Sequence, residues 1–238
     1  MHRPLSIAVL ASVMALLAGS ASARPEAGAH PCGPKGTGVD FRAADGLRLH
    51  GHRFGRGTTA VVFAHESRGG SCQWIPFARS LARRGYLTLA FDFRGYGRSQ
   101  TPRRSASSRL AADVIAAARK SRSLGAKKVV LVGASMGGTA VIVAAANART
   151  LVNGVIPISA PTSYGRMDAL SAARRLQMPV LYLVGEGDEG FVDHARLLYE
   201  ATASADKKLE ILDSSQHGVL LAPEPPARSL IESFVAAR

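Results

Sequence analysis

The sequence predicts an α/β protein with a mostly parallel central sheet of about eight strands and helices on both faces. Short runs of β-branched and apolar residues alternate along the chain with longer segments whose apolar residues recur at helical spacing. Strands and helices that alternate in this way form parallel sheets covered on both faces. About 215 residues follow the N-terminal leader described below, a length that suits one domain with a well-developed core.

The elements are expected in a regular order. Two alternating segments, residues 39–42 and 47–53, flank Ala44-Asp45-Gly46 and predict a hairpin. Further strands are expected at residues 60–64, 86–91, 128–132, 155–158, 180–184 and 209–212. Helices are expected at residues 74–84, 110–121, 139–148 and 191–200, near Leu170, and from Arg228 to the end.

The first 38 residues are expected to lie outside the folded domain, which we place at residues 39–238. Met1-His2-Arg3 is basic, residues 5–18 are predominantly apolar, and Ala21-Ser22-Ala23 fits a cleavage site. Together they predict a secretory signal peptide over residues 1–23, followed by a loose arm over residues 24–38 that is rich in Pro, Gly and Ala. The apolar run is too short to span a bilayer, so we expect a free protein in the periplasm or outside the cell.

The charge of the chain restricts its partners. The formal net charge is +13, but aromatic residues make up only 6% of the sequence. A protein that reads nucleic acid usually combines positive charge with a recognition module or stacking aromatics, so no specific nucleic-acid partner is predicted. We expect a solvated basic face, with weak attraction to anionic envelope polymers.

The two cysteines, Cys32 and Cys72, give one further expectation. In an oxidising compartment such a pair predicts a disulfide, which would pin the arm across the loop at Cys72; two unpaired thiols are the alternative. Neither cysteine lies next to a histidine or in a C-x-x-C pair, so no metal or redox site is predicted.

The run from Val129 to Gly138 is the segment most informative about chemistry. An apolar strand leads into Gly133-Ala134-Ser135-Met136-Gly137, and a helix-like segment follows at once. This pattern is typical of a nucleophile elbow, a sharp turn that exposes a serine hydroxyl at the end of a sheet. The glycines leave room for neighbouring backbone to pass close to the turn. A phosphate-binding turn is the alternative, but the turn has no basic residue.

A serine nucleophile needs a base and an orienting acid, and both are present downstream. His217 lies in the loop after the last strand and is the predicted base, whereas His194 lies within a predicted helix and is interpreted as a surface residue. Asp188 follows a glycine in the loop after residues 180–184 and is the predicted acid, with Glu186 in reserve. The backbone N–H groups of Met136 and Ser67 are the predicted oxyanion donors, with Glu66 as the alternative to Ser67.

With these residues in place, the chain resembles the α/β-hydrolase superfamily from about Val39 onward. The order Ser135, Asp188, His217 is the order of that family's triad. Residues 92–99, Asp-Phe-Arg-Gly-Tyr-Gly-Arg-Ser, are similar to the family's D-x-R-G-x-G-x-S segment, which the resemblance implies to be structural. The resemblance implies neither a metal nor an organic cofactor.

Two features bear on the branch of the family. His65-Glu66 is similar to the dienelactone hydrolase branch, although the nucleophile there is usually cysteine, so an esterase- or peptidase-like branch stays open. Only about twenty residues separate Ile158 from Pro179, too few for a large lid. Candidate substrate contacts are Glu66, Trp74 and Tyr164; a structurally paired Glu66 and a core-packed Tyr164 are the alternatives.

The predicted function is an exported serine hydrolase that cleaves small-molecule or polymeric carboxylic esters through an acyl-enzyme. A thioesterase or peptidase would use the same triad. A protein of a different class, which keeps the fold without catalysis and binds anionic envelope components, is the second hypothesis.

Overall fold

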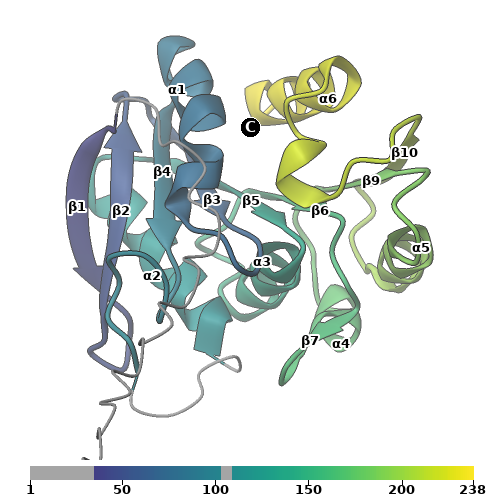
Figure 1. Ribbon diagram of the computed structural model, residues 1–238, viewed down its shortest axis with the longest axis horizontal. Coiled ribbons are helices and arrows are strands. Elements are labelled where there is room, and N and C mark those ends of the chain that lie inside the picture. The colour runs from purple at the N-terminus through teal and green to yellow at the C-terminus, as the bar shows by residue number, and fades with distance from the viewer. Residues whose placement is uncertain (1–34, 103–108) are drawn as a thin grey trace, which may run out of the picture.

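The computed structural model describes residues 35–102 and 109–238 (Figure 1). In this part of the chain, eight strands form one sheet in the order β1-β2-β4-β3-β5-β6-β9-β10. They are β1 (Thr37–Arg42), β2 (Arg48–Phe54), β3 (Thr59–Ala64), β4 (Leu87–Asp92), β5 (Lys128–Ala134), β6 (Gly154–Ile158), β9 (Val180–Gly185) and β10 (Lys207–Leu212).

The sheet is mostly parallel, as the sequence predicts. The β1–β2 hairpin is antiparallel, and β2 is antiparallel to β4. All pairings from β4 through β10 are parallel. The carboxyl ends of β5, β9 and β10 therefore meet at one edge of the sheet, where ligands bind in folds of this kind.

Helices cover both faces of the sheet (Figure 1). Helices α2 (Leu110–Ser123), α3 (Met136–Asn147), α4 (Ala169–Ala173) and α5 (Phe191–Ala201) pack on one face. Helices α1 (Ile75–Arg83) and α6 (Pro225–Ala236) pack on the other. Strand residues alternate between the two cores: in β3, Val62 faces the first and Val61 the second, and both are fully buried.

Local sequence explains where the helices on the second face begin and end. Proline occupies the first turn of both α1 and α6, where its missing N–H has no helical partner. Gly85 follows α1 with a φ of 92°, a conformation that glycine adopts without strain and that ends the helix.

The structure adds short elements that periodicity did not predict. A turn of 3₁₀ helix, η1 (Ser71–Trp74), precedes α1, and another, η3 (Gly218–Leu220), follows β10. Between β6 and β9, a two-residue hairpin of β7 (Ser163–Tyr164) and β8 (Met167–Asp168) precedes α4. The segment therefore carries no large lid, in agreement with its length.

The N-terminal expectations fall mostly outside this structure. The predicted signal peptide over residues 1–23 and most of the arm, including Cys32, lie outside the described residues. Within the described residues, no helix combines the length and the apolar character needed to cross a membrane.

Candidate active site

Ser135 sits in a strained turn between β5 and α3. Its backbone has φ 49° and ψ −116°, a conformation that costs non-glycine residues roughly 1–3 kcal/mol. The surroundings hold it there: Ser135 N–H donates to the carbonyl of Ile158 (2.9 Å), and the carbonyl of Ser135 accepts from Thr139 N–H (3.1 Å). The half-buried side chain therefore stands at the carboxyl end of β5 and the start of α3.

Close backbone packing around the turn requires its glycines. A Cβ on Gly133 would lie 2.3 Å from the carbonyl oxygen of Gly137, and a Cβ on Gly137 would lie 2.3 Å from that of Ala64. Real Cβ atoms do not approach backbone oxygens so closely. The turn, the first turn of α3 and the end of β3 thus interlock.

Asp188 and His217 are joined by a hydrogen bond across two loops. His217 Nδ1 lies 2.9 Å from Asp188 Oδ2 and 3.1 Å from Oδ1. An ionised carboxylate only accepts hydrogen bonds, so in this pair His217 Nδ1–H is the donor and Asp188 is the acceptor. Asp188 is buried, at 7% exposed, and is held by a bond from its N–H to the carbonyl of Gly185. Glu186, the reserve acid, is exposed.

The loop that carries His217 packs against the end of β5. Gly218 N–H donates to Ser159 Oγ (3.0 Å), one residue beyond the Ile158 carbonyl that holds Ser135. A Cβ on Gly218 would lie 3.4 Å from the Cβ of Ala134. The loops of Ser135, Asp188 and His217 thus lie at one edge of the sheet. Within the described residues the Ser135 hydroxyl forms no hydrogen bond; such bonds are often long without a bound substrate.

Glu66 links the loop after β3 to the loop that carries His217. Its Oε1 accepts a hydrogen bond from Gln73 Nε2 (2.9 Å), and its Oε2 accepts one from Val219 N–H (3.2 Å). A Cβ on Gly218 would lie 2.4 Å from Oε2, and Gly218 also has a φ of 54°. Both carboxylate oxygens are therefore engaged with protein groups, which is the structurally paired alternative left open by the sequence.

The two predicted oxyanion donors belong to adjacent elements. Gly137 packs against the backbone of Ala64 and His65, so the loop that contains Ser67 starts beside the amino end of α3, where Met136 N–H lies. His65 fixes this loop from beneath: its Nε2 accepts from Phe93 N–H (3.1 Å), and its Nδ1 donates to the carbonyl of Glu66 (2.7 Å). Complete burial lowers the pKa of His65 to about 4, so its ring is neutral.

Comparisons with known proteins agree with this architecture. A sequence profile described as "alpha/beta hydrolase fold" matches residues 59–174. An esterase from Exiguobacterium antarcticum superposes with a TM-score of 0.74 at 18% identity, covering 84% of this chain and 100% of that one. An esterase from Pyrococcus furiosus gives 0.73 at 17% identity, covering 84% and 90%. The chain therefore has the α/β-hydrolase fold.

Similarity in sequence alone is weaker. The uncharacterized protein YfhR of Escherichia coli K12 is 26% identical over 208 residues, which covers 75% of this chain and 72% of that protein. At these identities the solved structures establish the fold and leave the activity to be argued from the site.

The D-x-R-G-x-G-x-S segment shapes the loop beside the site. Asp92 accepts hydrogen bonds from the N–H groups of Ser71 (2.7 Å) and Arg98 (3.0 Å), and its carbonyl accepts from Ser99 Oγ (2.5 Å). A Cβ on Gly97 would lie 2.3 Å from Asp92 Oδ2, and Gly97 has a φ of 47°. Each of these contacts is internal to the protein.

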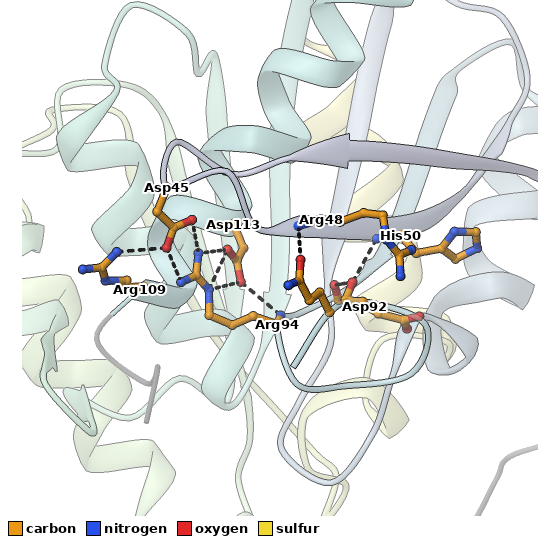
Figure 2. Close-up of polar contacts among 9 residues, drawn as sticks. Asp45, Arg48, His50, Asp92, Arg94, Arg109 and Asp113 are labelled. Carbon is orange, nitrogen blue, oxygen red and sulfur yellow. Dashed lines mark hydrogen bonds and ion pairs between the residues drawn. The ribbon is translucent and has the colours of Figure 1, made fainter. Parts of the chain in front are cut away.

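Arg94, the arginine of the same segment, is almost fully buried between two carboxylates (Figure 2). Its Nη2 donates to Asp113 Oδ1 (2.5 Å) in α2, and its Nη1 donates to Asp45 Oδ2 (2.8 Å) in the β1–β2 turn. Arg109 also reaches Asp45 (2.9 Å). The arginine therefore ties the hairpin, the end of β4 and α2 together.

Trp74, which the sequence predicts as a substrate contact, packs in the core instead. Its side chain is fully buried: the indole stacks on Phe63 with centroids 5.0 Å apart, and its N–H donates to the carbonyl of Ala64 (3.1 Å). It forms part of the wall of a small depression of about 190 Å³ between α1 and η3. Trp74 is a core residue because its polar atom has a backbone partner and its rings fill the space beneath α1.

Two aromatic side chains near the site were not predicted from sequence. The hydroxyl of Tyr96 points at Met136 Sδ (3.8 Å), and burial, together with the neighbouring Tyr164, raises the pKa of Tyr96. Phe191 packs on His217 with ring centroids 4.4 Å apart. Tyr164 is half-buried beside Tyr96, so this candidate contact lies on the Met136 side of the site. The sequence signals that could have identified them are the position of Tyr96 within the Asp92–Ser99 segment and that of Phe191 directly after the loop of Asp188.

His194 is half-buried rather than a surface residue. Its Nδ1 lies 3.1 Å from Thr162 Oγ1, so it anchors α5 to the loop after β6.

Cys72 lies in η1, but Cys32 lies outside the described residues, so the disulfide stays a prediction. Within the described residues, no three His, Cys, Asp or Glu side chains gather as a metal site would require.

Proposed function

We propose that this protein is a serine hydrolase that cleaves carboxylic esters through an acyl-enzyme. The observation that carries the proposal is the strained Ser135 turn standing at the same sheet edge as the hydrogen-bonded Asp188–His217 pair. A backbone strain of this kind persists where the surrounding structure fixes a functional geometry. The structural neighbours from Pyrococcus furiosus and Exiguobacterium antarcticum are esterases, which supports the same reaction class.

In the proposed reaction, Ser135 Oγ attacks the ester carbonyl carbon while His217 Nε2 takes its proton. Asp188 holds the ring in the tautomer that leaves Nε2 free and stabilises the imidazolium that forms. The same proton then passes to the leaving alkoxide. Water then gives a proton to His217 Nε2 and attacks the acyl carbon. The bond between this carbon and Ser135 Oγ breaks, the acid leaves, and His217 returns the proton to Ser135 Oγ.

The negative charge of each tetrahedral intermediate falls on the former carbonyl oxygen. Met136 N–H, at the amino end of α3, and Ser67 N–H are the proposed donors. The helix dipole of α3 adds to this stabilisation because its positive end faces the site. Removing one such donor typically lowers kcat by a factor of about 10²–10³.

The test is hydrolysis of p-nitrophenyl esters from acetate to palmitate, together with labelling by a fluorophosphonate. Ser135→Ala and His217→Ala should each abolish turnover and, for Ser135→Ala, labelling as well. Ser229→Ala is the matched control, since Ser229 is exposed on α6. Without a large lid, we expect activity to peak at short acyl chains.

The outcomes separate the competing functions. Labelling of Ser135 without hydrolysis of any simple ester would point to a thioester, a peptide or a polymeric ester. If Ser135 is not labelled and no ester is hydrolysed, the enzymatic function is rejected and the non-catalytic binding protein is favoured. Substantial activity in Ser135→Ala would reject the triad.

We further propose that the protein is exported, with Arg24 as the first residue of the mature chain and a Cys32–Cys72 disulfide. The support is the basic, apolar and A-x-A pattern of residues 1–23. N-terminal sequencing of the exported protein should begin at Arg24, and its intact mass should be 2 Da below that of the reduced form, about the mass of two hydrogens. An N-terminus at Met1 would contradict export.

A further inference from the structure

One depression on the described surface lies away from the candidate active site. It has a volume of about 510 Å³ and is lined by arginines from two elements. Arg53 and Arg56 come from the end of β2 and the turn after it, and Arg79 and Arg83 come from α1. Because Phe54 pairs with Thr88 at the beginning of β4, this depression lies at the amino ends of the parallel strands. Ser135 and Asp188 lie at or beyond the carboxyl ends.

The depression concentrates positive charge without neutralising it. Among the residues that the structure describes, no aspartate or glutamate lines it. In residues 35–102 and 109–238, none of the four arginines forms an ion pair, whereas Arg84, next in the chain, pairs with Glu232. Four like charges around one concavity raise the local potential, and a bound anion relieves that repulsion.

We propose that this arginine pocket, formed by Arg53, Arg56, Arg79 and Arg83, binds a compact oxyanion of the phosphate class that carries several negative charges. Guanidinium groups present fixed forks of N–H donors that match phosphate oxygens. The guanidinium group of Arg53 is already oriented, because its Nη1 donates a hydrogen bond to the carbonyl of Gly55 (3.3 Å). The volume falls in the range of small-molecule sites and exceeds what a single phosphate fills, which favours a diphosphate.

The inference is independent of ester hydrolysis, because the pocket and the candidate active site share no residue. Four of the positive charges that contribute to the net charge of +13 are concentrated in this pocket.

The test is isothermal titration of the full-length protein with inorganic pyrophosphate at fixed ionic strength. We expect saturable binding of one pyrophosphate. Arg56→Gln and Arg83→Gln should each weaken it about tenfold, and the double variant about a hundredfold, as losses of charge-assisted hydrogen bonds. Both side chains are exposed and make no hydrogen bond within the described residues, so the variants should fold with unchanged thermal midpoints.

Two controls distinguish specific binding in the arginine pocket from non-specific electrostatic attraction to the protein surface. The double variant Arg119→Gln/Arg149→Gln removes the same charge from exposed positions outside the pocket and should bind pyrophosphate as the wild type does. Equal weakening in this control, or no saturable binding by the wild type, would overturn the proposal. Vesicles containing phosphatidylglycerol test the lipid source: binding to vesicles without binding to pyrophosphate would also overturn it.

Discussion

At the scale of single residues, Glu66 shows how a side chain beside the candidate site can act without meeting substrate. Its two oxygens receive hydrogen bonds from Gln73 in η1 and from Val219 in η3, so it joins the two loops that carry Ser67 and His217. A carboxylate can accept on both sides, whereas an amide can accept on only one. Glu66 is therefore expected to position His217.

Glu66→Gln should lower kcat/KM about tenfold and destabilise the protein by about 1–3 kcal/mol, because one buried donor loses its acceptor. Steady-state kinetics on the best ester and thermal unfolding measure both effects. Glu186→Gln, which removes an exposed carboxylate from the acid loop, should change neither. Equal kcat/KM and stability in Glu66→Gln and the wild type would exclude the positioning role.

His65 provides a second prediction, this time on protonation. Its folded pKa is lowered to about 4 by burial, while that of the unfolded chain is about 6.5. Between these values the unfolded state binds more protons, so stability is lost as pH falls from about 6.5 through about 4. Nitrogen NMR of the ring should find the neutral Nδ1–H tautomer at pH 6; a doubly protonated ring at that pH would contradict the assignment.

At the scale of elements, the turn at Ser135 depends on backbone contact between β3, β5 and α3. Gly137→Ala should therefore destabilise the protein by more than the roughly 1 kcal/mol of an ordinary glycine substitution, because its Cβ would meet the carbonyls of Ala64 and His65 at 2.3 and 2.6 Å. Gly46→Ala is the matched control: Gly46 has a φ of 80°, but its Cβ would meet nothing within 4 Å. Denaturant unfolding compares the two, and equal losses would show that the turn can relax.

The extent to which sequence predicts this molecule also differs between elements. The sequence pattern predicts the long buried strands, such as β5 and β9, and the amphipathic helix α1. Their bounds lie within a few residues of those predicted. The β7–β8 hairpin is too short to have a period. Burial was harder to predict, because only the tertiary packing shows that Trp74 is fully buried and that His194 is half-buried against Thr162.

The residues of the candidate site follow the same logic. The loops of Asp188 and His217 were predictable because each follows a strand that ends at the same edge of the sheet. The contacts of Glu66 were not, since Gln73 and Val219 are linked to it only by the folded chain. A local motif can identify a nucleophile, but the groups that hold its partners come from distant segments.

At the scale of the whole molecule, Arg94 connects three separate parts of the chain (Figure 2). It pairs with Asp113 in a fully buried contact and with Asp45 in a partly exposed one. Asp113→Asn leaves a buried guanidinium without its main counter-charge and should destabilise the protein by about 3–5 kcal/mol. Asp45→Asn should cost about 1 kcal/mol or less near neutral pH, because water screens that pair. Equal losses in chemical denaturation would contradict this division.

The contribution of Asp45 should also disappear in acid. The hydrogen bond from Arg94 is the largest cause that lowers the folded pKa of Asp45 to about 2, against about 3.9 in an unfolded chain. Its stabilisation is therefore fully present above about pH 4 and is lost as pH falls through about 2. The difference in thermal midpoint between the wild type and Asp45→Asn should stay constant from pH 7 to pH 5 and shrink towards pH 2. A difference that stays undiminished at pH 2, where about half of the Asp45 carboxylates are protonated, would mean that Asp45 acts through its shape in the β1–β2 turn.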